Sequence, residues 1–117
     1  MITAYLLDAS HEDLQQLKIM LESTGKVAVV GMSLNPREAV NEIEQLCPRV
    51  LFLEMQFPNL EGMAIAEQLK GLCPDLKIIV VTSSKRYALW AFEHEIADYV
   101  LKPLQECRVC DALTRVQ

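Results

Sequence analysis

The stretch Val50-Leu51-Phe52-Leu53-Glu54-Met55-Gln56-Phe57-Pro58 joins a short apolar run, a single carboxylate and a loop. An apolar run of this kind is typical of a strand that is covered on both faces of a parallel sheet. Glu54 follows the run directly, and Pro58 and Gly62 mark a loop before a helical pattern begins. Open α/β sheets build their sites at the carboxyl ends of their strands. Glu54 is therefore the first candidate functional residue.

Strand-like and helix-like patterns alternate on both sides of this stretch, as in a parallel sheet whose strands are joined by helices. Strands are predicted over residues 2–7, 27–30, 50–53, 77–81 and 97–101. Helices are predicted after Ser10, after Asn35, over 63–69, over 85–93 and over 104–116. Right-handed crossovers leave few topologies for such a chain. We predict one domain, residues 1–117, with an α/β three-layer (βα)5 flavodoxin-like fold and parallel sheet order 2-1-3-4-5.

Capping residues predict where three of the helices begin. Ser10 is a helix cap, and Asp13 is placed three residues later to complete a capping box. Asn35-Pro36 combines a cap with a proline at the first helical position. Ser83 or Ser84 is the expected cap of the fourth helix.

A short motif occurs twice, 26 residues apart: Leu46-Cys-Pro-Arg-Val50 and Leu72-Cys-Pro-Asp-Leu76 both lead from a helix end into a strand. Cys47 and Cys73 in these motifs are expected to be small buried residues. Cys107-Arg-Val-Cys110 has the C-x-x-C spacing, but it lies in a helical pattern and not at the strand-to-helix turn of a thioredoxin-type redox pair. We expect all four cysteines to be structural, without metal or redox chemistry.

Composition limits the class of partner. The chain is 51% apolar, which suits a packed domain, and its net charge of −5 argues against direct binding to nucleic-acid phosphates. The apolar run over residues 2–7 is too short for a signal or membrane segment. We expect no membrane association and a cytoplasmic location.

Four polar residues follow or end the predicted strands. Asp8, Glu54, Thr82 and Lys102 lie at the ends of the first, third, fourth and fifth strands. Because the carboxyl ends of parallel strands meet at one edge of a sheet, these side chains should lie close together.

With this constellation the chain resembles the receiver domains of two-component response regulators, the CheY-like fold. The motifs that carry the resemblance are Phe52-Leu-Glu-Met-Gln-Phe-Pro58 with Gly62, Val81-Thr82, Tyr87-Ala88, Ala91-Phe92 and Asp98-Tyr-Val-Leu-Lys-Pro103. Their spelling is most similar to receivers linked to LytTR-type or related transcriptional output domains. The resemblance implies a regulatory module that receives a signal from a histidine kinase and controls an attached or partner transcriptional output.

The resemblance also implies roles for single residues. In that family an aspartate after the third strand accepts a phosphoryl group, and acids after the first strand help to hold Mg²⁺. A Thr or Ser and a Lys bind the phosphoryl oxygens, and an aromatic residue moves with the switch. Asp8, Thr82, Lys102 and Tyr99 match these positions, and Lys102-Pro103 matches the family's usual cis peptide bond.

Two residues depart from the family pattern. Glu54 stands at the phosphoacceptor position, and Ala9 stands where a second acid would be. With Asp8, Glu54 and the backbone carbonyl of Gln56 as the remaining ligands, we expect weak Mg²⁺ binding at best. The longer Glu54 side chain should reach Lys102 and bias the domain toward its active form without phosphorylation. The glutamate is either natural or an introduced phosphate mimic, and Ala9 favours a natural degenerate receiver.

Two other functions stay open beside this one. The first is a competent, Mg²⁺-dependent phosphoacceptor with self-dephosphorylating activity that uses Asp8 and Glu54. The second is a small-molecule binder of the flavodoxin type, which the acidic segment Asp8–Asp13 disfavours because it would repel a phosphate. No nucleophile with a paired base is found, so we expect no enzyme.

The predicted fourth helix suggests a partner surface. Ala88, Ala91 and Phe92 have the spacing of one helix face and should pack on the sheet. Trp90 would then point outward and, with Tyr99, form a partner or homodimer surface on the side of helix four, strand five and helix five.

Overall fold

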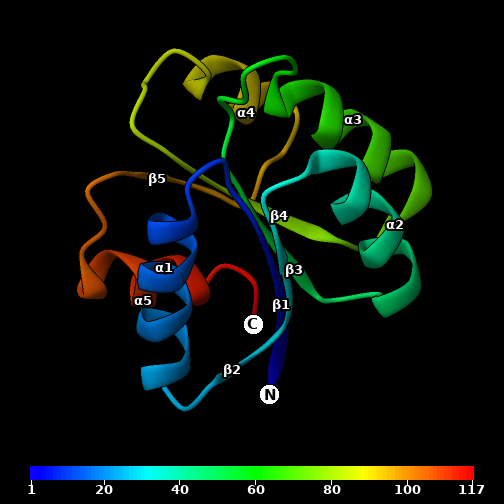
Figure 1. The fold of residues 1–117 in the computed structure, drawn as a ribbon. Helices are drawn as coiled ribbons and strands as arrows, with labels where there is room; N and C mark the ends of the chain where they lie inside the picture. Colours follow the sequence, from blue (N-terminus) through cyan, green and yellow to red (C-terminus); the bar gives the residue numbers. More distant parts are fainter.

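A computed structural model describes all 117 residues as five strands that alternate with five helices (Figure 1). The strands are β1 (Ile2–Leu7), β2 (Val27–Ser33), β3 (Val50–Leu53), β4 (Lys77–Thr82) and β5 (Asp98–Leu101). The helices are α1 (His11–Ser23), α2 (Pro36–Leu46), α3 (Gly62–Leu72), α4 (Ala88–Glu93) and α5 (Glu106–Leu113). All strand pairs are parallel, and the order β2-β1-β3-β4-β5 confirms the predicted topology.

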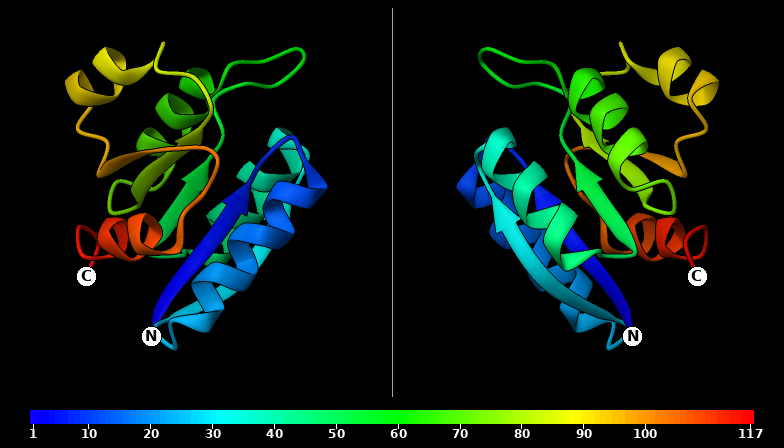
Figure 2. Two further views of the ribbon diagram at one scale, coloured as in Figure 1. Left: turned by 90° about the vertical axis from the view of Figure 1, so that its left-hand side faces the viewer. Right: turned by 90° about the vertical axis from the view of Figure 1, so that its right-hand side faces the viewer.

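The sheet is the middle of three layers. Helices α1 and α5 cover one face, whereas α2, α3 and α4 cover the other (Figures 1 and 2). Successive residues of β1 serve opposite faces, because Leu6 packs with Leu14 of α1 and Tyr5 packs with Ile43 of α2. No helix is both long and apolar enough to cross a bilayer.

Two predicted helix caps are confirmed. The Ser10 hydroxyl accepts a hydrogen bond from the Asp13 N–H at 3.2 Å. The Asn35 side chain accepts from the N–H groups of Arg37 and Glu38 at 2.9 and 3.2 Å. These bonds satisfy backbone donors that have no partner inside a helix.

Some element bounds differ from prediction. Strand β2 runs to Ser33, beyond the predicted end at residue 30, because Leu7 at the end of β1 still pairs with it. Helix α4 begins at Ala88, and neither Ser83 nor Ser84 caps it. The Ser84 hydroxyl instead accepts from the Arg86 N–H in a turn that precedes the helix. Helix α5 is also shorter than the predicted 104–116.

The predicted orientation of α4 is wrong. Phe92 is 83% exposed, and the buried pair is Tyr87 and Ala91, four residues apart. Trp90 is half-buried against the core on the α2–α3 side, and its ring stacks on His94 with centroids 4.6 Å apart. The exposed apolar residues of α4 are Leu89 and Phe92, so Trp90 is not its most outward side chain.

The burial of Cys47 and Cys73 differs from prediction. All four are free thiols, and only Cys73 is half-buried. Cys47 is exposed because it ends α2 with a left-handed backbone (φ 48°), a conformation found at chain turns. Cys107 and Cys110 are exposed on α5.

A close approach at Gly31 provides a test of the packing between β1 and β2. A Cβ atom at Gly31 would lie 2.6 Å from the Tyr5 ring, which is fully buried. We expect Gly31→Ala to lower the free energy of unfolding by about 1–3 kcal/mol, because the ring has no room to move. Urea unfolding measures this change.

Gly71→Ala is the matched control. Nothing lies within 4 Å of a Cβ at Gly71, which is helical, so this change should raise the free energy of unfolding by up to about 1 kcal/mol. Equal effects of the two substitutions would contradict the packing argument.

Candidate functional site

The four polar strand-end residues meet at one edge of the sheet, as predicted. Asp8 and Glu54 follow β1 and β3, whose ends are joined by a hydrogen bond from the Glu54 N–H to the Leu7 carbonyl at 2.9 Å. Thr82 ends β4, and its carbonyl accepts from the Lys102 N–H at 2.9 Å. The backbone ladder of the sheet thus sets the position of each side chain.

Both carboxylate oxygens of Glu54 are occupied by protein donors. Oε1 accepts from the Thr82 hydroxyl at 2.7 Å and from the N–H groups of Met55 and Gln56, each at 3.0 Å. Oε2 lies 2.8 Å from Nζ of Lys102. Glu54 is 5% exposed, so these contacts replace its hydration.

Lys102 is the centre of the site, since its ammonium contacts three carboxylates. Nζ lies 2.9 Å from Asp8 Oδ2, 2.8 Å from Asp13 Oδ2 and 2.8 Å from Glu54 Oε2. An ammonium has three donors, so each one has a charged acceptor. Burial alone would lower the pKa of Lys102, but the three carboxylates outweigh it and raise that pKa well above its usual value. We call Asp8, Asp13, Glu54 and Lys102 the lysine cluster.

Asp13 is the member of this cluster that the sequence analysis missed. Its spacing from Ser10 predicts half of a capping box, but its side chain bonds Lys102, and the Ser10 N–H donates to Asp8 Oδ1 at 3.0 Å instead. The available signal was its position in the first turn of the helix that follows β1, directly beside the strand ends. Burial raises the pKa of Asp8, an effect that the bonds from Lys102 and Ser10 only partly offset.

The residues do not fit the Mg²⁺ site that the resemblance implies. The Asp8 and Glu54 oxygens are directed at protein donors, and Ala9 offers no ligand. The Gln56 N–H donates to Glu54, so Gln56 supports the carboxylate through its backbone. No group of three or more His, Cys, Asp or Glu side chains has the geometry to hold a metal ion.

Tyr99 connects β5 to the loop after β4. It is half-buried, and its hydroxyl donates to the backbone carbonyl of Ser84, two residues after Thr82. Burial raises the pKa of Tyr99, so the phenol stays a donor at neutral pH. Trp90, in contrast, makes no contact with the lysine cluster and packs on α4 and the core.

Removal of the Lys102 charge tests the lysine cluster. Lys102→Met should lower the free energy of unfolding at pH 7 by about 3 kcal/mol, because buried carboxylates lose their cation. The loss should shrink as the pH falls toward 4. Burial raises the folded-state pKa of Asp8, so the folded state gains stability as Asp8 takes up a proton. This gain should be larger in Lys102→Met, because the cation that lowers the pKa of Asp8 is then absent. Urea unfolding at pH 7 and pH 5 measures both effects.

Lys85→Met is the control, because Lys85 is exposed and in no ion pair. Its effect should stay within about 0.5 kcal/mol at either pH. A pH-independent loss in Lys102→Met would show that the cluster is held by packing and not by charge.

Comparison with known proteins gives the family. Residues 5–114 match the family model described as response regulator receiver domain. An uncharacterized response regulatory protein of Vibrio cholerae is 34% identical over 118 residues, which are 99% of this chain and 48% of that protein. The transcriptional regulatory protein BtsR of Salmonella typhi is 33% identical over 119 residues, 100% of this chain and 48% of that protein. The chain thus spans about half the length of these relatives.

A solved structure shows the same fold. The crystal structure of the response regulatory domain of protein mrkE from Klebsiella pneumoniae superposes with a TM-score of 0.89 at 23% identity, covering 98% of this chain and 94% of that one. The strand order, the edge site and the matched family model agree, and this chain belongs to the receiver domains of two-component response regulators.

Proposed function

We propose that this receiver is held toward its active state by its own Glu54, and that it acts on an attached or partner transcriptional output without phosphorylation. The observation that carries the proposal is the pair of contacts from Glu54 to Thr82 and Lys102, at 2.7 and 2.8 Å. These are the two side chains that match the phosphoryl-binding positions of the family. A carboxylate that is one carbon–carbon bond longer than aspartate meets the donors that a phosphoryl group would meet.

The energies set how strong this bias is. A hydrogen bond to a charged group contributes about 1.5–3 kcal/mol, whereas a shift of a two-state switch from 1:99 to 99:1 takes about 5.5 kcal/mol. A phosphoryl group brings about −1.5 to −2 charges and three acceptor oxygens, against one charge and two oxygens for Glu54. We therefore propose partial activation. A histidine kinase could still dock, but it would not need to transfer its phosphoryl group.

The contact between Tyr99 and Ser84 supports a route from the site to the surface. The Thr82 hydroxyl donates a hydrogen bond to Glu54, and two residues later the Ser84 carbonyl accepts one from the Tyr99 hydroxyl. The site and β5 therefore constrain the same loop, which leads into α4. We propose that this route sets the shape of the surface formed by α4, β5 and α5.

That surface is the proposed homodimer interface. Leu89 and Phe92 of α4 are 72% and 83% exposed. On the same proposed surface, Arg108 of α5 binds Asp98 of β5 through two hydrogen bonds, at 2.8 and 2.9 Å, which fix α5 against the sheet. Large exposed apolar side chains on α4, together with this polar pair, suit an interface core with a polar rim.

Incubation with a small-molecule phosphodonor and Mg²⁺, followed by intact-mass measurement, tests the role of Glu54. The wild-type chain should stay unmodified, because Glu54 is engaged by Thr82 and Lys102 and no metal ligand stands at Ala9. The double variant Glu54→Asp/Ala9→Asp should gain the mass of one phosphoryl group, since it restores the family's acids.

The rival function, a competent Mg²⁺-dependent phosphoacceptor, makes the opposite prediction. A stable phosphoryl adduct on wild-type Glu54 would refute our proposal. Stabilisation by low-millimolar Mg²⁺, read by melting temperature or Trp90 fluorescence, would favour the rival. An unchanged melting temperature in wild type, with a rise in the double variant, is the result we expect.

Sedimentation of the wild type and of Leu89→Ala/Phe92→Ala tests the interface. The double variant should dissociate at concentrations where the wild type is dimeric, because it removes the two exposed apolar side chains of α4. Ile19→Ala is the control, since Ile19 is 67% exposed on α1, on the other side of the sheet. Equal self-association of all three proteins would exclude this surface.

A further inference from the structure

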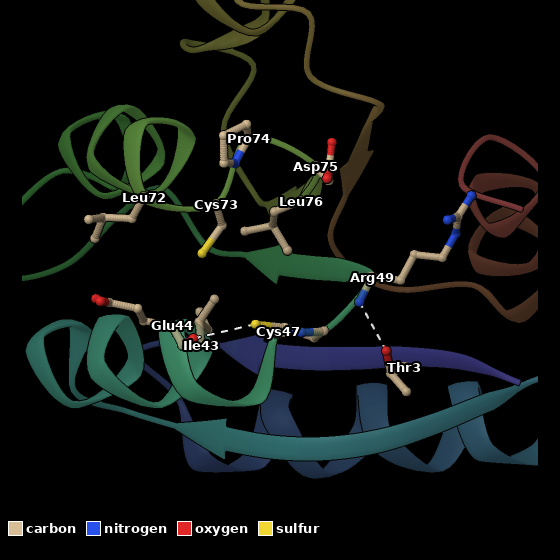
Figure 3. Close-up of a pocket in the computed structure, with 11 residues that line it drawn as sticks. Thr3, Ile43, Glu44, Cys47, Arg49, Leu72, Cys73, Pro74, Asp75 and Leu76 are labelled. Carbon is tan, nitrogen blue, oxygen red and sulfur yellow. Dashed lines mark hydrogen bonds between the residues drawn. The ribbon is translucent and has the colours of Figure 1, made fainter.

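The two Leu-Cys-Pro motifs meet at a pocket on the amino edge of the sheet, opposite the lysine cluster. The pocket has a volume of about 470 Å³ and lies between the carboxyl ends of α2 and α3 (Figure 3). Its walls include residues 47–49 from the first motif and residues 72–76 from the second. The fold therefore brings together two turns that are 26 residues apart in the chain.

Each motif contributes a thiol to this pocket. Cys47 ends α2, and its thiol donates to the Glu44 carbonyl at 3.4 Å. Cys73 ends α3, and its N–H donates to the Leu69 carbonyl at 2.7 Å. The Cys73 side chain points toward α2, whereas the Cys47 thiol lies along the end of α2, and both residues line the same pocket (Figure 3). Neither sulfur is used by the receiver site, and both are free.

The two thiols differ in access and reactivity. Cys47 is exposed, whereas Cys73 is half-buried. Burial raises the pKa of the Cys73 thiol, and the nearness of Cys47 and Glu44 raises it further. Cys47 is thus the thiol that should react first with a reagent in solution, and Cys73 should react second and more slowly.

We propose that Cys47 and Cys73 form a thiol–disulfide exchange site that accepts a small organic disulfide and closes into an internal bond between α2 and α3. The Cys47 thiolate attacks one sulfur of the reagent, which forms a mixed disulfide and releases one small thiol. The Cys73 thiolate then attacks the Cys47 sulfur and releases the second small thiol. The two cysteine sulfurs are oxidised, the reagent is reduced, and the two cysteine protons end on the released thiols.

The position of the bond decides its effect. It would close a loop from residue 47 to residue 73 that contains β3, Glu54 and all of α3. Such a bond restricts the unfolded chain more than the folded one, so the oxidised protein should melt at a higher temperature. The chemistry should be slow, on the order of minutes to hours, because the half-buried Cys73 thiol beside a carboxylate is mostly protonated.

Reaction of the full chain with millimolar glutathione disulfide at pH 8 tests the proposal. Digestion without reductant and mass spectrometry should find a peptide linked through Cys47 and Cys73. The melting temperature should rise by roughly 10 °C and return after treatment with a dithiol reductant. The variant Cys107→Ser/Cys110→Ser is the matched control, because its two substituted thiols are exposed on α5, and it should behave like the wild type.

Single variants test the order of the steps. Cys73→Ser should stop at one glutathione on Cys47, and Cys47→Ser should react far more slowly and form no internal bond. Reduced forms of both should melt within a few degrees of the wild type, since each change replaces one small side chain by another. The proposal is overturned if the wild type ends with two separate mixed disulfides, bonds only Cys107 to Cys110, or takes up no reagent.

Discussion

The contact of one ammonium with three carboxylates is the constraint on which the carboxyl edge of this molecule depends. Lys102 reaches Asp8, Asp13 and Glu54 at 2.8–2.9 Å, and these residues come from three different parts of the chain. Without the cation, buried carboxylates would repel one another at the ends of β1 and β3. The lysine cluster therefore couples the docking of α1 and the loop after β5 to the end of β3, where Glu54 lies.

The sequence predicted the backbone positions of this site but not all its contacts. Strand periodicity and parallel topology determine where each strand ends, and that was enough to place Asp8, Glu54, Thr82 and Lys102 together. The sequence did not predict Asp13 as a residue of the lysine cluster, because the direction of its side chain depends on how α1 packs on the sheet. A helix of six residues, α4, offers too few positions for periodicity, and its buried face is fixed by Tyr87, which precedes it.

The same contacts explain why the lysine cluster differs from a metal centre. Mg²⁺ prefers six oxygen ligands in near-octahedral geometry and keeps several waters. Here the Glu54 oxygens accept from Thr82, from two backbone N–H groups and from Lys102. Protein donors therefore occupy both oxygens that a metal ion would need. An ammonium supplies positive charge without a demand for that geometry. The charge of Lys102 thus satisfies the carboxylates of the lysine cluster within the protein.

A carboxylate that belongs to the chain also changes how a receiver can be regulated. A phosphoryl group is removed by hydrolysis, whereas Glu54 stays, so the bias that we propose is constant in time. A constant bias can be adjusted only by an interaction at another site on the strands and helices that position Glu54. Strand β3 runs from the pocket lined by Cys47 and Cys73 to the lysine cluster. Glu54 follows this strand, and Cys47 precedes its first residue by three positions. A bond between Cys47 and Cys73 would act on the opposite end of the strand that positions Glu54, and the lysine cluster would stay intact.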